Sequence, residues 1–304
     1  MLKASFKDSS PANQMLLSGC TMVLSFLVML FITSIGAYLF FGVNIFTQPE
    51  ALNTMNKDVN LPLLKYYQVM YSLGLFVIPP FLLAYLFHHR ISEYLCLNVS
   101  AKRTKYVLAA LLTILALPLI NLMAEFNSHL SLPDFLSGVE EWMRNSEENV
   151  KVITEKFLEM KTTGDLMINL FMIALIPALG EELLFRGIFQ KLITKWTNNK
   201  HAGIILAAMA FSALHLQFFG FLPRMMMGIL FGYLLIWTGS LWIPIVAHFI
   251  NNSMAVIFYF LVARGYFPEE VNNIGSTDNG WAASIISLAL TGYLVFFFYR
   301  TRKR

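Results

Sequence analysis

The sequence carries little charge: only 13% of its 304 residues are Asp, Glu, Lys or Arg. A soluble domain usually has about 25% charged residues, so the deficit argues against an ordinary water-soluble protein. Hydrophobic residues make up 57% of the chain, and the mean hydropathy is +0.61. The net charge of +4 does not point to a nucleic-acid partner, because the basic residues stand in short loops between apolar runs, as in membrane proteins.

Cysteine is scarce as well. Cys20 falls in an apolar run and Cys96 in a basic loop, so the two form neither a disulfide framework nor a CxxC metal pair. A cleavable signal peptide is not expected either. Its apolar stretch would span about 7–15 residues, whereas the first apolar run extends from about Met15 to Val43 and is better interpreted as a true membrane span.

Long apolar runs are what the sequence has in place of charge. A helix that spans a bilayer needs about 20 mostly apolar residues. Eight runs qualify, at residues 15–43, 64–87, 105–124, 165–190, 202–219, 223–238, 242–263 and 281–299. The predicted fold is therefore all-α, a polytopic bundle of about eight transmembrane helices. No repeat or linker interrupts the chain, so residues 1–304 are expected to form a single integral membrane domain.

The distribution of basic residues predicts the orientation. With eight spans, the basic residues of both termini, of the second connection and of the connection after the fourth span fall on one side of the membrane. Cytoplasmic loops are enriched in Lys and Arg, so both termini are expected in the cytoplasm, in a bacterial inner membrane. The residues concerned are Lys3, Lys7, Arg90, Lys102, Arg103, Lys105, Lys191, Lys195, Lys200, Arg300, Arg302, Lys303 and Arg304. The opposite side receives a mixed loop with Glu50, Lys57 and Asp58 and the acid-rich stretch 134–161.

Residues 134–161, between the third and fourth spans, have a helical pattern of their own. Apolar residues such as Val139, Trp142 and Phe157 recur at helical spacing, and acidic and basic residues fill the other face. The pattern predicts one or two amphipathic helices at the membrane surface. They could form a lid over a site, or only connect two spans.

The fourth span contains charged residues that require an explanation, because a charge inside a membrane helix is costly unless it is paired or hydrated. Glu182 and Arg186 are four residues apart, on one helix face and in the favourable order. Their pairing would reduce the cost of both charges. Glu181 points about 100° away and remains the free carboxylate, which suits a general base.

Two later spans add polar side chains. The fifth carries His215, and the seventh carries His248 and Asn252, which are four residues apart on one face. Each feature alone has a plain structural interpretation, as an interhelical hydrogen bond or an ion pair. Their occurrence on three separate helices favours one shared site, since bundle-core sites are built from facing helices.

These residues fall into three ordered motifs: Glu-Glu-x-x-x-Arg at 181–186, Phe-x-x-x-His at 211–215 and His-x-x-x-Asn at 248–252. The set resembles the motifs of the CPBP family of intramembrane proteases, which includes the type II CAAX prenyl endopeptidases and bacteriocin-processing and Abi-type relatives. The resemblance covers residues 165–263, the motif-bearing catalytic core. Residues 1–160 and 264–304 carry no matching motif.

The resemblance implies a role for each motif residue. Glu181 would activate a water molecule with the help of His215, while His248 and Asn252 would polarise the scissile carbonyl and stabilise the oxyanion. Glu182 and Arg186 would support Glu181. Members of the family have also been described as metalloproteases, and Glu181, His215 and His248 would match a catalytic zinc shell. The HExxH spacing of zinc proteases is absent, so no cofactor is favoured and Zn²⁺ remains the alternative.

The leading functional hypothesis is therefore an intramembrane endopeptidase that cleaves a protein or peptide substrate near the cytoplasmic face, through a cavity open to the cytoplasm. The alternative is a non-proteolytic membrane scaffold or bacteriocin-immunity protein that uses the same pocket. A transporter is a third hypothesis, because buried acids and histidines also relay protons. The paired halves and broken helices of transporters are missing from the sequence. The partners expected are a peptide substrate and membrane lipid, and no nucleic acid.

Overall fold

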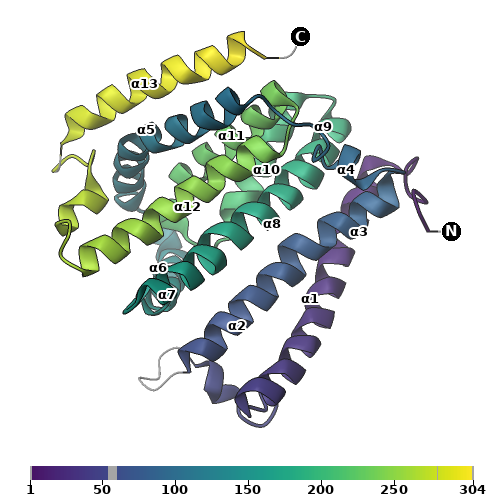
Figure 1. Cartoon of the computed structure of the whole chain (residues 1–304), viewed down its shortest axis with the longest axis horizontal. Helices are drawn as coiled ribbons and strands as arrows, with labels where there is room; N and C mark the ends of the chain where they lie inside the picture. The colour runs from purple at the N-terminus through teal and green to yellow at the C-terminus, as the bar shows by residue number, and fades with distance from the viewer. Residues whose placement is uncertain (1, 54–59, 279, 303–304) are drawn as a thin grey trace.

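The computed structural model describes residues 2–53, 60–278 and 280–302, and every regular element in these ranges is helical. Lys57, Asp58, Lys303 and Arg304 lie outside the described residues. The predicted all-α fold is confirmed (Figure 1). The α-helices are α1 Pro11–Phe41, α2 Leu61–Ser72, α3 Ile78–Phe87, α4 Ile91–Tyr94, α5 Arg103–Ser128, α6 Ser137–Leu158, α7 Thr163–Asn169, α8 Ile176–Leu184, α9 Gln190–Thr197, α10 Lys200–Ala213, α11 Phe221–Thr238, α12 Trp242–Ala263 and α13 Trp281–Arg300.

Three π-helical segments join neighbouring α-helices into continuous rods. Leu73–Val77 links α2 to α3, Leu170–Leu175 links α7 to α8, and Phe185–Phe189 links α8 to α9. Within the described residues, seven rods are long and apolar enough to cross a membrane, which confirms a polytopic membrane protein. They are Pro11–Phe41, Leu61–Phe87, Arg103–Ser128, Thr163–Thr197, Phe218–Thr238, Trp242–Ala263 and Trp281–Arg300.

The fifth predicted run, 202–219, is the one that differs. Its helix, α10, is an apolar helix of 14 residues that ends at Ala213, and at about 1.5 Å per residue it is shorter than a bilayer core. A turn follows, in which Leu216 has a left-handed backbone with φ of 53°, and then a 3₁₀ turn at Phe218–Gly220. The chain therefore turns back after only 14 helical residues, and His215 lies on this turn.

The bundle has two distinct ends. The basic end gathers the N-terminal segment, the connection 88–102, the turns 198–199 and 239–241, and residues 301–302. Contacts tie these parts together: Trp242 donates to the Leu97 carbonyl at 2.9 Å, Leu241 N donates to the Cys96 carbonyl at 3.1 Å, and Phe6 N to the Leu86 carbonyl at 3.0 Å. The other end, called here the α6 end, holds residues 129–162, 214–220 and 264–278, joined for example by Arg264 and the Lys161 carbonyl at 2.8 Å.

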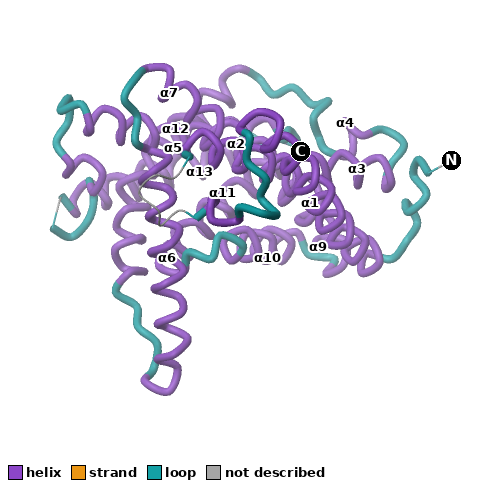
Figure 2. Tube along the Cα trace, turned by 90° about the horizontal axis from the view of Figure 1, so that it is seen from below, coloured by secondary structure: helices purple, strands orange, loops and turns teal. Residues whose placement is uncertain are grey.

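The predicted amphipathic stretch forms the single helix α6. It runs across the spans rather than alongside them and projects beyond the bundle (Figures 1 and 2). Its first half keeps apolar side chains outside, with Val139 45% and Trp142 54% exposed, although Trp142 also packs against Phe218. Its second half turns inward, where Phe157 is buried. This is the arrangement of a helix that lies at a membrane interface.

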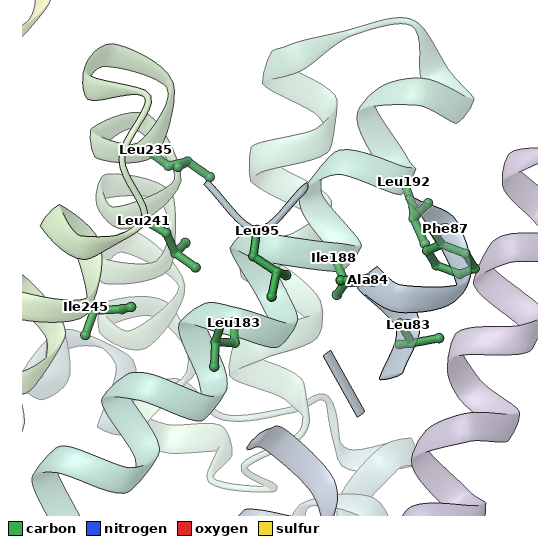
Figure 3. Packing of buried hydrophobic residues seen from close by; sticks show 10 residues of the cluster. All are labelled: Leu83, Ala84, Phe87, Leu95, Leu183, Ile188, Leu192, Leu235, Leu241 and Ile245. Atoms are coloured by element: carbon green, nitrogen blue, oxygen red, sulfur yellow. The ribbon is translucent and has the colours of Figure 1, made fainter. Parts of the chain in front are cut away.

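A packed apolar layer fills the bundle at the basic end. Its ten buried residues come from α3, the segment after α4, the rod of α8 and α9, α11, and α12 with the turn before it, and Figure 3 shows them converging around Leu95. They are Leu83, Ala84, Phe87, Leu95, Leu183, Ile188, Leu192, Leu235, Leu241 and Ile245. Leu183 directly follows the two glutamates of α8, so this layer closes the interior on the basic side of the polar residues.

Candidate active site

The helix α8 that carries the two glutamates is set between two π-helical segments. Such single-turn expansions are frequent at functional sites. Pro177 stands in its first turn, and Gly180, next to Glu181, allows a close approach. A Cβ atom at Gly180 would lie 2.8 Å from the Cβ of Phe76 on the π-helical segment between α2 and α3. The α8 backbone is therefore held directly against a neighbouring rod at the level of the glutamates.

Glu182 is the centre of a buried ionic cluster. Arg186 Nη1 donates to Glu182 Oε1 at 2.7 Å, as the four-residue spacing predicted, and Nη2 donates to the Gly228 carbonyl at 3.0 Å. His248 Nδ1 lies 2.9 Å from the same Glu182 oxygen. A carboxylate paired with arginine only accepts hydrogen bonds, so the Nδ1 nitrogen carries the proton. Glu182 thus fixes both the orientation and the tautomer of His248.

Glu181 is placed differently from its neighbour. Its carboxylate Oε2 lies 3.7 Å from His248 Nε2, which is beyond hydrogen-bond distance, and the residue is 8% exposed. It lines a cavity instead of joining the Arg186 cluster. The sequence argument that Glu181 is the free carboxylate of the pair agrees with this geometry.

His215 approaches the same cavity from the turn after α10. Its Nδ1 donates to the Phe211 carbonyl at 2.8 Å, and because a carbonyl only accepts, Nε2 is left as an acceptor. Phe211 packs edge-on against both histidine rings, with centroid distances of 5.0 Å to His215 and 5.8 Å to His248. Phe231 stacks on His248 from another side at 5.2 Å. Aromatic packing therefore orients both imidazoles.

Asn252 faces the helical rod of α7 and α8 from α12. Its Nδ2 lies 3.4 Å from the Ile173 carbonyl, which belongs to the π-helical segment Leu170–Leu175. Asn251 Nδ2 in turn donates to Asn252 Oδ1 at 3.2 Å. The side-chain amide of Asn252 is thus positioned by its neighbours, and Nδ2 keeps a second hydrogen.

All four residues predicted to be catalytic line one cavity of about 680 Å³. Glu181, His215, His248 and Asn252 come from α8, the turn after α10, and α12. Glu182 and Arg186 lie behind the wall, fully buried. The sequence thus identified side chains that the fold brings together.

The cavity is lined from the α6 end of the bundle, whereas the opening to the cytoplasm stays a prediction. Besides the polar residues, its wall is formed by Val150, Thr154 and Phe157 of α6 and by Gln217 and Gly220, all at the α6 end. On the other side, the apolar layer of Figure 3 closes the bundle. The sequence estimate considered only how far each residue lies from its helix end, and it did not anticipate which end the core would fill.

Arg224 is a cavity residue that the sequence analysis missed. It stands in the first turn of α11, and its Nη2 donates to Gln217 Oε1 at 2.6 Å while Nη1 donates to the Gln217 carbonyl at 3.3 Å. No carboxylate in the described part of the chain lies within 4.0 Å of its guanidinium. An arginine two residues into an apolar run was the available signal, since any charge in a span requires a reason.

The zinc alternative concerns Glu181, His215 and His248, which share the cavity. Across residues 2–53, 60–278 and 280–302, no three His, Cys, Asp or Glu side chains are grouped closely enough to hold a metal ion as they stand. The Nδ1 atoms of His215 and His248 are engaged by the Phe211 carbonyl and by Glu182, which leaves Nε2 as the nitrogen of each ring that could bind a metal. Zinc therefore remains an alternative to the metal-free reaction.

Comparison with known proteins gives a family match for the central segment of the chain. Residues 163–254 match the family model described as "Type II CAAX prenyl endopeptidase Rce1-like", which confirms the resemblance predicted from the three motifs. The uncharacterized protein YpbD of Bacillus subtilis (strain 168) is 34% identical over 90 residues, covering 28% of this chain and 43% of YpbD. The membrane-embedded CAAX protease MroQ of Staphylococcus aureus (strain USA300) is 34% identical over 99 residues, covering 31% of this chain and 40% of MroQ.

The extent of these matches is limited. The chain covers less than half the length of either relative, and no solved structure matches it. The matched segment includes all three motifs and the helices α7 to α11 together with the first half of α12.

Proposed function

We propose that the chain is a CAAX-protease-like intramembrane endopeptidase of the glutamate type, since residues 163–254 match the Rce1-like family model. Its substrate would be a protein or peptide that reaches the membrane interior. The observation that carries the proposal is the cavity in which Glu181, His215, His248 and Asn252 meet. A general base, an acceptor and two donors around one space are what amide hydrolysis requires.

The proposed reaction assigns one task to each residue. Glu181 takes a proton from a water molecule as the water oxygen bonds to the carbonyl carbon, and His215 Nε2 accepts the second water hydrogen and orients the nucleophile. The carbonyl π electrons move to the carbonyl oxygen, which accepts hydrogen bonds from Asn252 Nδ2 and from His248 Nε2–H when that nitrogen is protonated. When the C–N bond breaks, the proton held by Glu181 passes to the leaving amine.

Glu182 and Arg186 act through His248 and the α8 backbone rather than on the substrate. Because Glu182 accepts from His248 Nδ1 at 2.9 Å, it keeps the Nε2 edge of the ring turned toward Glu181. Arg186 neutralises Glu182 and fastens α8 to α11 through the Gly228 carbonyl. This arrangement fixes the orientation of the His248 ring without exposing the ion pair to the cavity.

The lining of the cavity supports a proposal for the side from which a substrate would enter. If the basic end is cytoplasmic, as the Lys and Arg distribution predicts, the α6 residues that line the cavity lie toward the opposite side of the membrane. The scissile bond would then lie in the half of the bilayer away from the cytoplasm. We propose this entry side in place of the cytoplasmic one.

The catalytic proposal is tested by the Glu181→Gln variant, which keeps the shape of the side chain and removes the base. Substrate profiling by proteomics should show peptides that are cut in cells with the wild-type protein and uncut with the variant. General-base catalysis contributes about 10²–10⁴ in rate, so turnover of any identified substrate should fall by at least about 100-fold. The matched control is Glu141→Gln on the exposed face of α6, which should retain activity.

Three outcomes would contradict the proposal. Unchanged cleavage by Glu181→Gln would refute the assigned base, and a cellular phenotype that survives the substitution without any cleavage would favour a scaffold or immunity role. Stoichiometric zinc in the active purified protein, with activity lost on chelation, would refute the metal-free reaction. Thermal unfolding of the variant should match the wild type, so that loss of activity is not loss of fold.

Entry from the α6 end is tested separately by cysteine labelling. In a background without Cys20 and Cys96, Asn145→Cys on α6 should react with a membrane-impermeant maleimide in intact cells. Ser100→Cys at the basic end should react only after permeabilisation. The reverse pattern would place the cavity mouth in the cytoplasm.

A further inference from the structure

A second hollow lies at the basic end, far from the catalytic cavity. It has a volume of about 1000 Å³ and is formed by the start of α5, the end of α11 and the end of α13. It shares no lining residue with the cavity that holds Glu181. Three membrane helices reach the surface around it, so it lies where lipid headgroups would meet the protein.

The rim of this hollow is strongly cationic. Lys102, Arg103, Lys105 and Arg302 line it, and no Asp or Glu does. Lys105 is held in place, since its ammonium donates to the hydroxyl of Thr301 and lies 4.9 Å from the centroid of the Phe298 ring. None of the four cations has a carboxylate within 4.0 Å among the described residues. Within the described part of the chain, no carboxylate therefore compensates this positive charge.

The wall below the rim is apolar. Val107 and Leu108 of α5, Trp237 of α11 and Phe297 of α13 face the hollow. Val107 is 51% exposed and Phe297 38% exposed, so the wall continues into the outer surface of α5 and α13 that faces lipid. A cationic rim above an apolar wall at the end of membrane spans is complementary to one kind of molecule, an amphiphile with an anionic head.

We propose that this hollow is a binding site for an anionic phospholipid. The phosphate group would lie between Lys102, Arg103 and Arg302, and an acyl chain would follow Val107 down α5. A free phosphate ion would use only the rim and would leave the apolar wall uncovered. Basic pockets between membrane helices on the cytoplasmic side recognise anionic headgroups in this way.

Such a lipid would have a structural consequence. Lys105 already joins α5 to the end of α13 through Thr301, and a headgroup across the rim would hold Arg302 as well. The site would thus fasten the last helix to the bundle in membranes rich in anionic lipid. This inference stands on the charge and shape of the hollow and does not depend on the protease activity.

The test uses full-length protein in detergent and native mass spectrometry with added phosphatidylglycerol or phosphatidylcholine. Wild type should retain phosphatidylglycerol in preference to phosphatidylcholine of the same chain length. Each cation near an anionic headgroup contributes about 1 kcal/mol. The triple variant Lys102→Gln/Arg103→Gln/Arg302→Gln should therefore bind phosphatidylglycerol on the order of 100-fold more weakly. The matched control Lys3→Gln/Lys7→Gln removes charge at the same end outside the hollow and should bind as wild type does.

Several results would overturn the proposal. These are equal retention of the two lipids by wild type, equal binding by the triple variant, or an equal loss in the Lys3→Gln/Lys7→Gln control. Full displacement of phosphatidylglycerol by millimolar inorganic phosphate would show an anion site instead of a lipid site. Because the three substituted residues are exposed at the surface, the triple variant should fold, and its size-exclusion profile checks this.

Discussion

The central and the outer helices of this bundle differ in how far they are buried and in the charges they carry. In the rod Thr163–Thr197, which carries both site glutamates, 61% of an apolar stretch of 18 residues is buried inside the protein. The corresponding share is 17% in α1 and 22% in α13. Figure 1 shows α1 and α13 on opposite outer sides, with α8 and α12 between them. The central rod can hold Glu181, Glu182 and Arg186 because protein surrounds it. The outer helices face lipid and carry apolar side chains there instead.

The largest effect should come from breaking the central ion pair. Arg186→Ala leaves Glu182 buried without its cation, which is expected to cost about 3–5 kcal/mol and to remove much of the folded protein. Lys195→Ala, on the exposed end of the same rod, should be nearly neutral. Thermal unfolding in detergent measures both. Similar melting temperatures for the two variants would show that the centre tolerates charge as the surface does.

A glycine comparison sharpens the contrast. A Cβ atom at Gly232 on α11 would lie 2.7 Å from Gln190 Oε1 and 2.9 Å from Ile204 Cγ2, whereas one at Gly292 on α13 would have no neighbour within 4 Å. Gly232→Ala should therefore destabilise by about 1–3 kcal/mol through overpacking. Gly292→Ala should be neutral or stabilise by up to about 1 kcal/mol through helix propensity. Equal unfolding midpoints would contradict the difference in packing.

Arg224 offers a smaller test at the cavity itself. At an effective dielectric constant of about 20, a unit charge within the same cavity contributes on the order of 1–2 kcal/mol to a charged transition state. Arg224→Gln should therefore change kcat/KM by roughly tenfold without unfolding the protein. Arg300→Gln at the end of α13 is the matched control and should leave kcat/KM unchanged. Equal changes in kcat/KM for Arg224→Gln and Arg300→Gln would contradict a specific effect of Arg224 in the cavity.

The smallest effect concerns the exposed helix α6. The hydrogen bond from Arg144, followed by one from Leu132 N, lowers the pKa of Glu140 below its ordinary value. A lowered carboxylate pKa contributes stability above the unfolded-state value of about 4.3, and the contribution is lost as pH falls through the folded-state value. Arg144→Gln should thus raise the Glu140 pKa, as followed by carboxyl carbon NMR. Any difference in melting temperature from wild type should disappear at acid pH. Glu141→Gln should leave the Glu140 titration unchanged.

Local spacing allowed much of the site to be predicted. The Glu182–Arg186 pair and the separate direction of Glu181 follow from helix geometry, and both agree with the structure. Contacts between helices could not be predicted from local spacing. The sequence does not show that His248 would pair with Glu182, or that Asn252 would meet the Ile173 carbonyl, because the register between rods depends on packing. The short α10 and the contribution of α6 to the cavity wall were missed for the same reason.

The π-helical segments on either side of α8 have a mechanical consequence. Each accommodates about one residue more than an α-helical turn would. Deleting one residue within 170–175 should therefore convert the wide turn into a regular one and leave Glu181 and Glu182 facing as they do now. The same deletion at the start of α8, where no wide turn takes it up, would instead rotate the glutamates by roughly 100° relative to α7. The wide turns thus let the chain gain or lose a residue next to the site without turning its side chains.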